Sequence, residues 1–268
     1  RISIEGLASV VGELEDLGVT RLTIIPSLFY QAARLNPEGM KNWASLRYFT
    51  VSGEECSMEV AKMFAELYFP TDTPEETPPP TLLNLYGSTE VTGDITHFAL
   101  TPSSLSVCMD LNKVPIGACM PENYMFLVKY TPDSGITAFL TSYTEDGEVM
   151  YIDEDGENKI GEVMVIGAHV ALGYAPASCN AHRFIPNPYH SHASAQASSA
   201  NSTLPSLPLH IQSALSHYPL AYLMGDICSY HKPSKSLLYV GRVAAGIRQV
   251  KIHGVRVELD AVELSLIH

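Results

Sequence analysis

Three helical patterns and three strand patterns alternate along the first third of the chain. Apolar residues recur at helical spacing over residues 3–17, a β-rich run follows at 21–25, and the alternation continues with helices at 27–35 and 58–69 and strands at 46–51 and 82–86. Gly18 is placed to end the first helix, and Ser57 to cap the third. Such alternation is typical of a parallel sheet with helices on its faces, so we predict an α/β layer over residues 1–112.

The ends of the three predicted strands carry small, polar, turn-forming residues. Ligands of parallel sheets bind beyond the carboxyl ends of the strands. We therefore expect backbone N–H groups at these ends to lie close to a bound molecule, although each end taken alone is equally explained as a turn. The three strand ends are Pro26-Ser27, Ser52-Gly53-Glu54 and Gly87-Ser88-Thr89-Glu90.

The middle of the chain changes character. Short apolar runs at 123–129, 137–143, 148–152 and 162–167 are separated by Gly, Pro, Asp and Asn, which is typical of antiparallel strands in a small barrel or sandwich. We predict a β-rich, barrel-like subdomain over 113–240, with a mobile insertion rich in Ser, Ala, Pro and His near 187–219. A hinge and the truncated start of a C-terminal lid domain are predicted over 241–268, with a final helix opening at Asp260.

An acidic stretch at 145–157 invites a calcium-binding interpretation. Its glycine, Gly156, falls too early after Asp153 for the EF-hand pattern, so a solvated hairpin turn is the preferred interpretation.

The net charge excludes some classes of binding partner, and the cysteines indicate the cellular compartment. Sixteen basic against twenty-nine acidic residues give a formal net charge of −13, which argues against nucleic acid or an anionic membrane surface as the main partner. No apolar stretch is long enough to span a membrane. The five cysteines are scattered without a CxxC pair, which indicates reduced thiols and a cytoplasmic protein. Because the chain opens with Arg1 and shows no signal segment, we expect an internal fragment of a longer protein.

The segment that follows the third strand combines residue types suited to a nucleotide. Tyr86 offers a flat ring for stacking on a base, and Gly87 lets the backbone approach a phosphate. Ser88 and Thr89 can donate hydrogen bonds to phosphate oxygens, while Glu90 is a hard oxygen ligand of the kind that Mg²⁺ accepts. Each residue taken alone also fits a turn or a helix cap.

Further along, Asp226 follows a strand-like run and could accept hydrogen bonds from both hydroxyls of a ribose. The phrases RLTIIPS, VSGEE, NLYGSTEVTGD, VPIGACMPEN, GEVMVIGAHVALGY, RFIPNPY, YLMGDICSY, VGR and QVKIHGVRVEL occur in this order. In these phrases the chain resembles the adenylate-forming (AMP-dependent synthetase/ligase) superfamily, in particular adenylation domains of the nonribosomal-peptide-synthetase type. NLYGSTEVTGD is most similar to the branch of beta-alanine-activating, or aminoadipate-semialdehyde-dehydrogenase-like, enzymes.

The resemblance implies an ATP-dependent ligase that activates a small carboxylic or amino acid as its adenylate. Mg²⁺ assists, and the acyl group passes to the thiol of phosphopantetheine, carried by a carrier-protein domain, or of coenzyme A. The resemblance also implies roles for individual residues. By this resemblance, Tyr86 stacks on adenine beside Gly53 and Glu54, and Asp226 and Arg242 bind the ribose. Gly87 and Ser88 approach the phosphates, Thr89 contacts the α-phosphate, and Glu90 holds Mg²⁺. The residues that line the acyl pocket are Ser27, Thr50, Ser52, Leu85, Gly93 and Asp94. Asp94 could pair with a substrate amine, or it could simply face water.

Departures from the family pattern leave other interpretations open. The family's phosphate loop lies upstream of this sequence, and its catalytic lysine would fall beyond His268. Ala244 stands where the family typically has a hinge aspartate. A non-catalytic module that binds a nucleotide or docks a carrier protein is therefore the alternative. An α/β hydrolase is disfavoured because the chain lacks a GxSxG nucleophile elbow.

Overall fold

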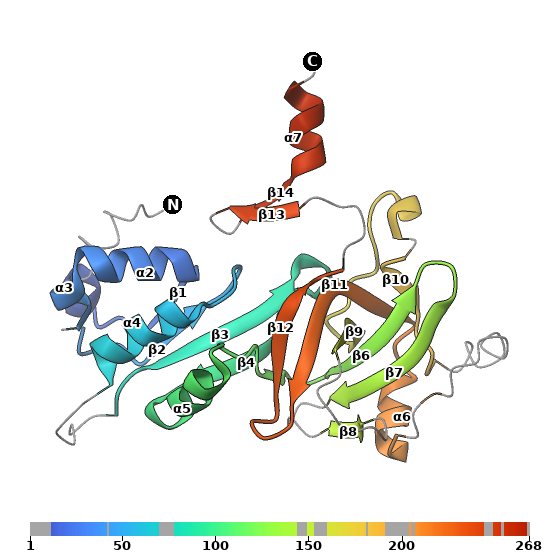
Figure 1. Ribbon diagram of the computed structural model, residues 1–268, viewed down its shortest axis with the longest axis horizontal. Helices are drawn as coiled ribbons and strands as arrows, with labels where there is room; N and C mark the ends of the chain where they lie inside the picture. Colours follow the sequence, from blue (N-terminus) through green and yellow to red (C-terminus); the bar gives the residue numbers. More distant parts are fainter. Residues whose placement is uncertain are drawn as a thin grey trace. The chain divides into compact units, whose positions relative to one another are not determined.

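A computed structural model describes most of the chain as two compact units (Figure 1). The first unit comprises residues 1–85, 98–114 and 244–268, and the second comprises 86–97 and 115–243. The predicted boundaries at residues 112 and 240 stay predictions. The described residues are 12–41, 43–69, 78–143, 149–152, 160–180, 182–190, 204, 207–243, 249–252 and 255–266.

The first unit contains the predicted parallel strands with helices beside them. Strands β1 (Arg21–Ile24), β2 (Tyr48–Val51) and β3 (Thr81–Ser88) run parallel in that order, with Ile24 aligned to Val51 and Val51 aligned to Asn84. Their sheet continues with β4 (Gly93–Leu100) and β5 (Ala118–Cys119), so β3 and β4 each have residues in both units. The helices are α2 (Pro26–Leu35), α3 (Pro37–Lys41), α4 (Met58–Tyr68) and α5 (Pro102–Leu111).

Local sequence signals explain where these helices begin and end. Pro26 occupies the first turn of α2, where its missing N–H costs nothing. The side chain of Ser57 accepts a hydrogen bond from the Val60 N–H and caps α4, as predicted. Helical structure at residues 12–16 is followed by Gly18 with φ +66°, and the first part of that predicted helix, residues 3–11, lies outside the described residues.

An aromatic cluster forms the core of the first unit. Phe49 of β2 packs against Phe29 of α2, with ring centroids 5.0 Å apart, and against Phe64 of α4 at 6.1 Å. Because Phe49 points to one face of the sheet, both helices cover that face. Trp43 is only 2% exposed, and its indole N–H donates to the Val19 carbonyl at 3.1 Å. The fold class predicted for this part of the chain is confirmed.

The second unit is built on an antiparallel sheet in the order β10-β11-β9-β6-β7-β8, with β12 paired to β11. The β-rich character is confirmed, but the barrel-like form is not found, because among the described residues the end strands β8 and β10 do not pair. They are only four and three residues long and offer few groups for closure. The strands are β6 (Asn123–Thr131), β7 (Gly135–Tyr143), β8 (Val149–Ile152), β9 (Ile160–Gly167), β10 (Phe184–Pro186), β11 (Leu220–His231) and β12 (Ser236–Arg242).

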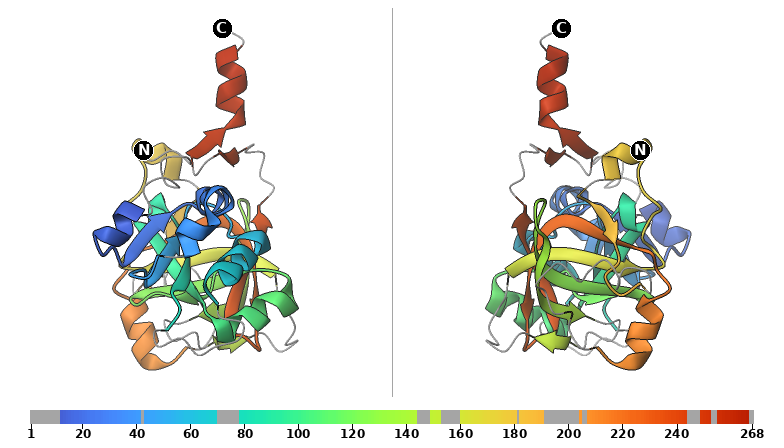
Figure 2. Two further views of the ribbon diagram at one scale, coloured as in Figure 1. Left: turned by 90° about the vertical axis from the view of Figure 1, so that its left-hand side faces the viewer. Right: turned by 90° about the vertical axis from the view of Figure 1, so that its right-hand side faces the viewer.

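Both faces of this sheet are buried. Along β6, Met125 and Leu127 join one apolar cluster while Phe126 and Val128 join another, as expected for side chains that alternate across a strand. Helix α6 (Leu209–Leu215) covers the second face (Figure 2). This arrangement explains why the strand sequences are apolar at nearly every position.

Part of the mobile insertion predicted near 187–219 is ordered, because its described residues include helix α6. Leu207, Ile211 and Leu215 are buried in the second cluster, and the Asn187 side chain donates to the carbonyls of Leu215 and Tyr218. The sequence analysis missed this helix because its apolar side chains are spread over barely two turns. Residues 191–203, 205 and 206 lie outside the described part of the chain.

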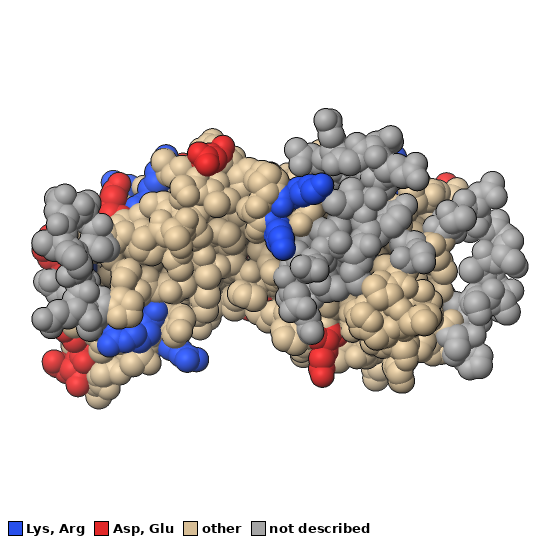
Figure 3. All heavy atoms as spheres, turned by 90° about the horizontal axis from the view of Figure 1, so that it is seen from below, with Lys and Arg blue, Asp and Glu red and all other residues tan. Residues whose placement is uncertain are grey.

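The remaining described elements are short. Strands β13 (Gln249–Ile252) and β14 (Val255–Glu258) pair antiparallel, and α7 (Leu259–Leu266) begins one residue before the predicted start at Asp260. Most of the acidic stretch 145–157 lies outside the described residues. No described helix is long and apolar enough to cross a membrane. On the face drawn in Figure 3, the described basic side chains are few and form no continuous patch.

Candidate functional site

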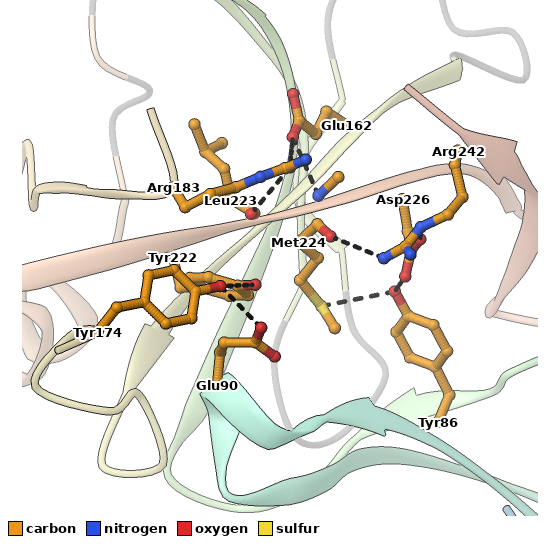
Figure 4. Close-up of polar contacts among 11 residues, drawn as sticks. Tyr86, Glu90, Glu162, Tyr174, Arg183, Tyr222, Leu223, Met224, Asp226 and Arg242 are labelled. Atoms are coloured by element: carbon orange, nitrogen blue, oxygen red, sulfur yellow. Dashed lines mark hydrogen bonds and ion pairs between the residues drawn. The ribbon is translucent and has the colours of Figure 1, made fainter. Parts of the chain in front are cut away.

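The carboxylate of Asp226 lies between two donors from different strands of the second unit (Figure 4). The Tyr86 hydroxyl donates to Oδ2 at 2.7 Å, and Arg242 Nε donates to Oδ1 at 2.7 Å. Strand register explains part of this arrangement, since Asp226 of β11 stands directly opposite Arg242 of β12. Asp226 is 7% exposed, so the carboxylate is held in one orientation.

The surroundings of Asp226 fix the charge state of both donors. Burial raises the pKa of Tyr86 well above its usual value, and the nearby Cys228 and Asp226 raise it further. Burial lowers the pKa of Arg242, but the charge of Asp226 and the hydrogen bond outweigh burial, so its net pKa is raised. Tyr86 therefore stays a neutral donor and Arg242 stays a cation. A carboxylate has about four acceptor positions, so about two remain for ligand hydroxyls.

Glu90 lies nearby in the same unit, in the 3-10 turn η1 (Thr89–Val91). Its Oε1 accepts a hydrogen bond from the Tyr174 hydroxyl at 2.7 Å, and that hydroxyl lies 3.4 Å from the hydroxyl of Tyr222. Burial, followed by the hydrogen bond with Tyr174, raises the pKa of Tyr222, so this phenol stays neutral. Figure 4 shows these three side chains gathered beside Met224.

The carboxylate of Glu90 has the donor chemistry that Mg²⁺ requires. Glu90 is 7% exposed, and no group of three or more His, Cys, Asp or Glu side chains that could hold a metal occurs among the described residues. Mg²⁺ bound to nucleotides is typically held by one or two carboxylates together with phosphate oxygens and water. Glu90 therefore fits a nucleotide-associated Mg²⁺, and no all-protein metal cage forms around it among the described residues.

The three residues that precede Glu90 have distinct environments. A Cβ on Gly87 would collide with the backbone of Gly93 and lie 2.7 Å from Asp94 Cα, so Gly87 is needed for the close approach of β4. The Ser88 hydroxyl is buried and has no hydrogen-bond partner among the described residues. Thr89 is exposed.

Two of the predicted strand ends meet within the first unit. The Ser27 N–H, in the first turn of α2, donates to Glu54 Oε2 at 3.3 Å. Gly53 adopts φ +88°, which turns the chain after β2 and aims Glu54 toward α2. Glu54 therefore caps a helix, whether or not it also borders a base.

The residues expected to line an acyl pocket are divided between the units. Thr50 lies on β2, Ser52 follows that strand, and Leu85 lies on β3; together with Ser27 they belong to the first unit and are partly buried. Gly93 and Asp94 begin β4 in the second unit. The pocket assignment stays a prediction.

Sequence reasoning missed several side chains that surround Asp226 and Glu90. Arg183 Nη1 donates to Glu162 Oε1 at 3.3 Å, and the Gly225 N–H donates to the same oxygen at 3.1 Å. A signal existed, because Glu162, Tyr174 and Arg183 stand in phrases that carry the family resemblance. Their side chains received no role because spacing alone does not reveal contacts across strands.

Comparison with known proteins decides the family. A family model described as "AMP-binding enzyme" matches residues 5–175, which is more than half of the chain. The chain belongs to the AMP-binding enzyme family. The resemblance to adenylation domains is thus confirmed, and the chain is similar to nonribosomal peptide synthetases.

Two curated relatives illustrate that relationship. The beta-alanyl-bioamine nonribosomal peptide synthetase ebony of Drosophila melanogaster is 28% identical over 264 residues, which cover 96% of this chain and 23% of ebony. Gramicidin S synthase 2 of Brevibacillus brevis is 24% identical over 260 residues, covering 97% of this chain and 4% of the synthase. The chain thus spans about a quarter or less of the length of these relatives.

Solved structures share the fold. A nonribosomal-peptide-synthetase protein containing adenylation and PCP domains matches with a TM-score of 0.63 and 21% identity, over 99% of this chain and 35% of that one. The Vibrio cholerae adenylation domain AlmE, in complex with glycyl-adenosine-5'-phosphate, matches with a TM-score of 0.61 and 20% identity, over 98% of this chain and 38% of that one. The fold of this chain is therefore that of adenylation domains.

Proposed function

We propose that this chain is the nucleotide-binding part of an ATP-dependent ligase that activates a carboxylic acid. A carboxylate oxygen of the acid attacks the α-phosphorus of ATP, the bond to the β-phosphate oxygen breaks, and pyrophosphate leaves. A thiol of phosphopantetheine or coenzyme A then attacks the acyl carbon of the adenylate, gives up its proton and releases AMP. Both steps depend on positioning and on charge neutralisation.

The observation that carries this proposal is the carboxylate of Asp226 held between Tyr86 and Arg242. Two engaged acceptor positions fix the carboxylate, and the remaining ones suit the paired hydroxyls of a ribose. The guanidinium of Arg242 forms an ion pair with this carboxylate and balances its negative charge. A nucleoside whose ribose bonds to Asp226 would have its base beside the ring of Tyr86, where stacking is favourable.

Glu90 would hold a nucleotide-associated Mg²⁺, which when bound offsets negative charge on the phosphate oxygens. Tyr174 contributes by fixing Oε1 of Glu90 at 2.7 Å. Thr89 is exposed and would donate its hydroxyl to the α-phosphate, and Gly87 and Ser88 lie directly before it. The buried, unsatisfied hydroxyl of Ser88 supports a polar occupant here, because such groups usually find a partner.

For the acid we keep the pocket residues predicted from the sequence. We favour an amino acid, because Asp94 could form an ion pair with a substrate amine. The glycyl-adenosine-5'-phosphate bound by AlmE supports this substrate class. A carrier-protein partner is supported by the adenylation and PCP domains of the first structural relative. The proposed pocket residues are Ser27, Thr50, Ser52, Leu85, Gly93 and Asp94.

A cytoplasmic setting belongs to the same proposal. Cys56, Cys108, Cys119 and Cys228 are buried, and these four described cysteines form no disulfide. Cysteines without disulfides are usual where the compartment keeps thiols reduced.

The test is carboxylate-dependent ATP–pyrophosphate exchange by the full-length protein that contains this chain. We expect exchange with a set of amino acids to single out a substrate, and we expect Glu90→Ala and Asp226→Ala each to lower the exchange rate at least tenfold. Glu66→Gln, on the exposed side of α4, is the control and should leave the rate unchanged. Undiminished exchange by Glu90→Ala would refute the magnesium role. Binding of a non-hydrolysable acyl-AMP mimic without any exchange would instead identify a non-catalytic module.

A further inference from the structure

Strand β11 separates from β9 at the residues that present Asp226. Leu223 pairs with Met164 and Ile227 pairs with Glu162, so the ladder is interrupted between Leu223 and Ile227. Gly225, within this bulge, adopts φ +72°, a conformation that glycine tolerates and other residues rarely adopt. The direction of the Asp226 side chain therefore depends on what holds the bulge.

The backbone of Gly225 is fixed on both sides. Its N–H donates to Oε1 of Glu162 at 3.1 Å, and its carbonyl accepts from the Val243 N–H at 2.9 Å. The first of these bonds replaces a ladder bond that the bulge removes, using a side chain of β9. Without Glu162, the Gly225 N–H would be a buried donor with no acceptor, which is costly.

Glu162 is in turn held by Arg183. Arg183 Nη1 lies 3.3 Å from Oε1 of Glu162, whose side chain is 7% exposed. Burial raises the pKa of Glu162 above its usual value, and the positive charge of Arg183 and the Gly225 N–H offset part of this rise. Arg183 thus reduces the cost of burying this carboxylate near a second one, Asp226.

Arg183 also closes the space beside the bulge. A Cβ on Gly225 would collide with the Arg183 guanidinium, whose Nη1 lies 3.4 Å from the Leu223 carbonyl. The Leu223 N–H donates to the Arg183 carbonyl at 2.8 Å, so backbone and side chain of Arg183 both contact β11. Figure 4 shows the Glu162–Arg183 pair and the Asp226–Arg242 pair as neighbouring but separate ion pairs.

We propose that Glu162 and Arg183 are positioning residues that hold the bulge at Gly225 so that the Asp226 carboxylate faces the ribose diol. The inference rests on the proposed function, which gives Asp226 that ribose. Glu162 and Arg183 act through Gly225 and touch no ligand.

The test compares two probes, AMP and 2',3'-dideoxy-AMP, by equilibrium binding to the full-length protein. The ratio of their dissociation constants isolates recognition of the two hydroxyls. We expect Glu162→Ala to weaken AMP binding on the order of tenfold and leave the dideoxy nucleotide unaffected, so that the ratio approaches one. Glu162→Gln keeps an oxygen acceptor for the Gly225 N–H and should preserve most of the ratio, which a merely structural role would not require.

Controls separate this inference from general damage. Glu55→Gln breaks the exposed Lys113–Glu55 pair of the first unit and should leave the ratio at the wild-type value. Should Glu162→Ala not fold, Arg183→Gln is the second variant, and the same fall in the ratio is expected.

The outcomes distinguish the two proposals. A folded Glu162→Ala or Arg183→Gln variant that keeps the wild-type ratio overturns the positioning role alone. A wild-type protein that binds both nucleotides equally overturns the ribose role of Asp226, and with it the inference.

Discussion

Replacing Gly87 with alanine tests whether the close contact between β3 and β4 shapes the nucleotide-binding segment. The added Cβ would collide with the Gly93 carbonyl oxygen and would lie 2.7 Å from both the Gly93 carbonyl carbon and Asp94 Cα. All three atoms belong to backbone, which cannot rotate away as a side chain can. Overpacking of this kind costs about 1–3 kcal/mol, and we expect the upper end because two strands must separate. About 3 kcal/mol corresponds to a fall in Tm of about 6–12 °C for a chain of this size.

Thermal unfolding followed by circular dichroism measures this shift, with Gly241→Ala as the matched control. Gly241 also lies on a strand of the second unit, but no atom lies within 4 Å of its added Cβ. Alanine is favoured over glycine in a strand by about 0.5 kcal/mol, so the control should melt at the wild-type temperature or slightly above it. Equal melting temperatures for the two variants would refute the proposed close contact.

Three further predictions concern single groups. Burial, with Cys108 and Glu55 nearby, raises the pKa of the Cys56 thiol to about 12; iodoacetamide at pH 8.5 should modify Cys56 only after unfolding, and rapid labelling of the native protein would contradict this. The raised pKa of Tyr86 means that the fold favours the neutral phenol. Its contribution to the free energy of unfolding is present below the ordinary pKa of 10.0 and is lost as the pH rises above the folded-state pKa. The difference between the ultraviolet titration curves of the wild type and of Tyr86→Phe should show no ionisation near pH 10, and an ionisation there would contradict the raised pKa. Ser57→Ala removes the cap of α4 and should lower the free energy of unfolding in urea by about 1 kcal/mol, and an unchanged midpoint would count against the capping bond.

Much of the fold could be predicted because local and global signals agree. In the first third, helix-period and strand-period patterns are separated by turn residues, so the strands at Arg21–Ile24 and Tyr48–Val51 emerge within two residues of the predicted bounds. The four antiparallel strands from β6 to β9 were likewise located by Gly, Pro and Asp at their ends. Strand β4 and helix α5 were missed, although Thr101 forms a capping box with Ser104.

The contacts around Asp226 were harder to predict from the sequence. The types of residue at Tyr86 and Asp226 suggested a nucleotide, but the hydrogen bond between them joins positions 140 residues apart. The bulge at Gly225 depends on Glu162 of another strand, and the pattern of apolar residues along β11 does not predict it. Contacts between strands are set by register, and register follows from the whole sheet rather than from any one segment.

The single tryptophan gives the protein a built-in optical probe. Trp43 is buried in the first unit, with its indole N–H bonded to the Val19 carbonyl, and the sequence contains no other tryptophan. Its fluorescence therefore monitors the melting of the first unit alone, while tyrosine-dominated near-ultraviolet dichroism follows both. If the two signals diverge during denaturation, the two units unfold in separate steps, and no labelling of the protein is needed to observe this.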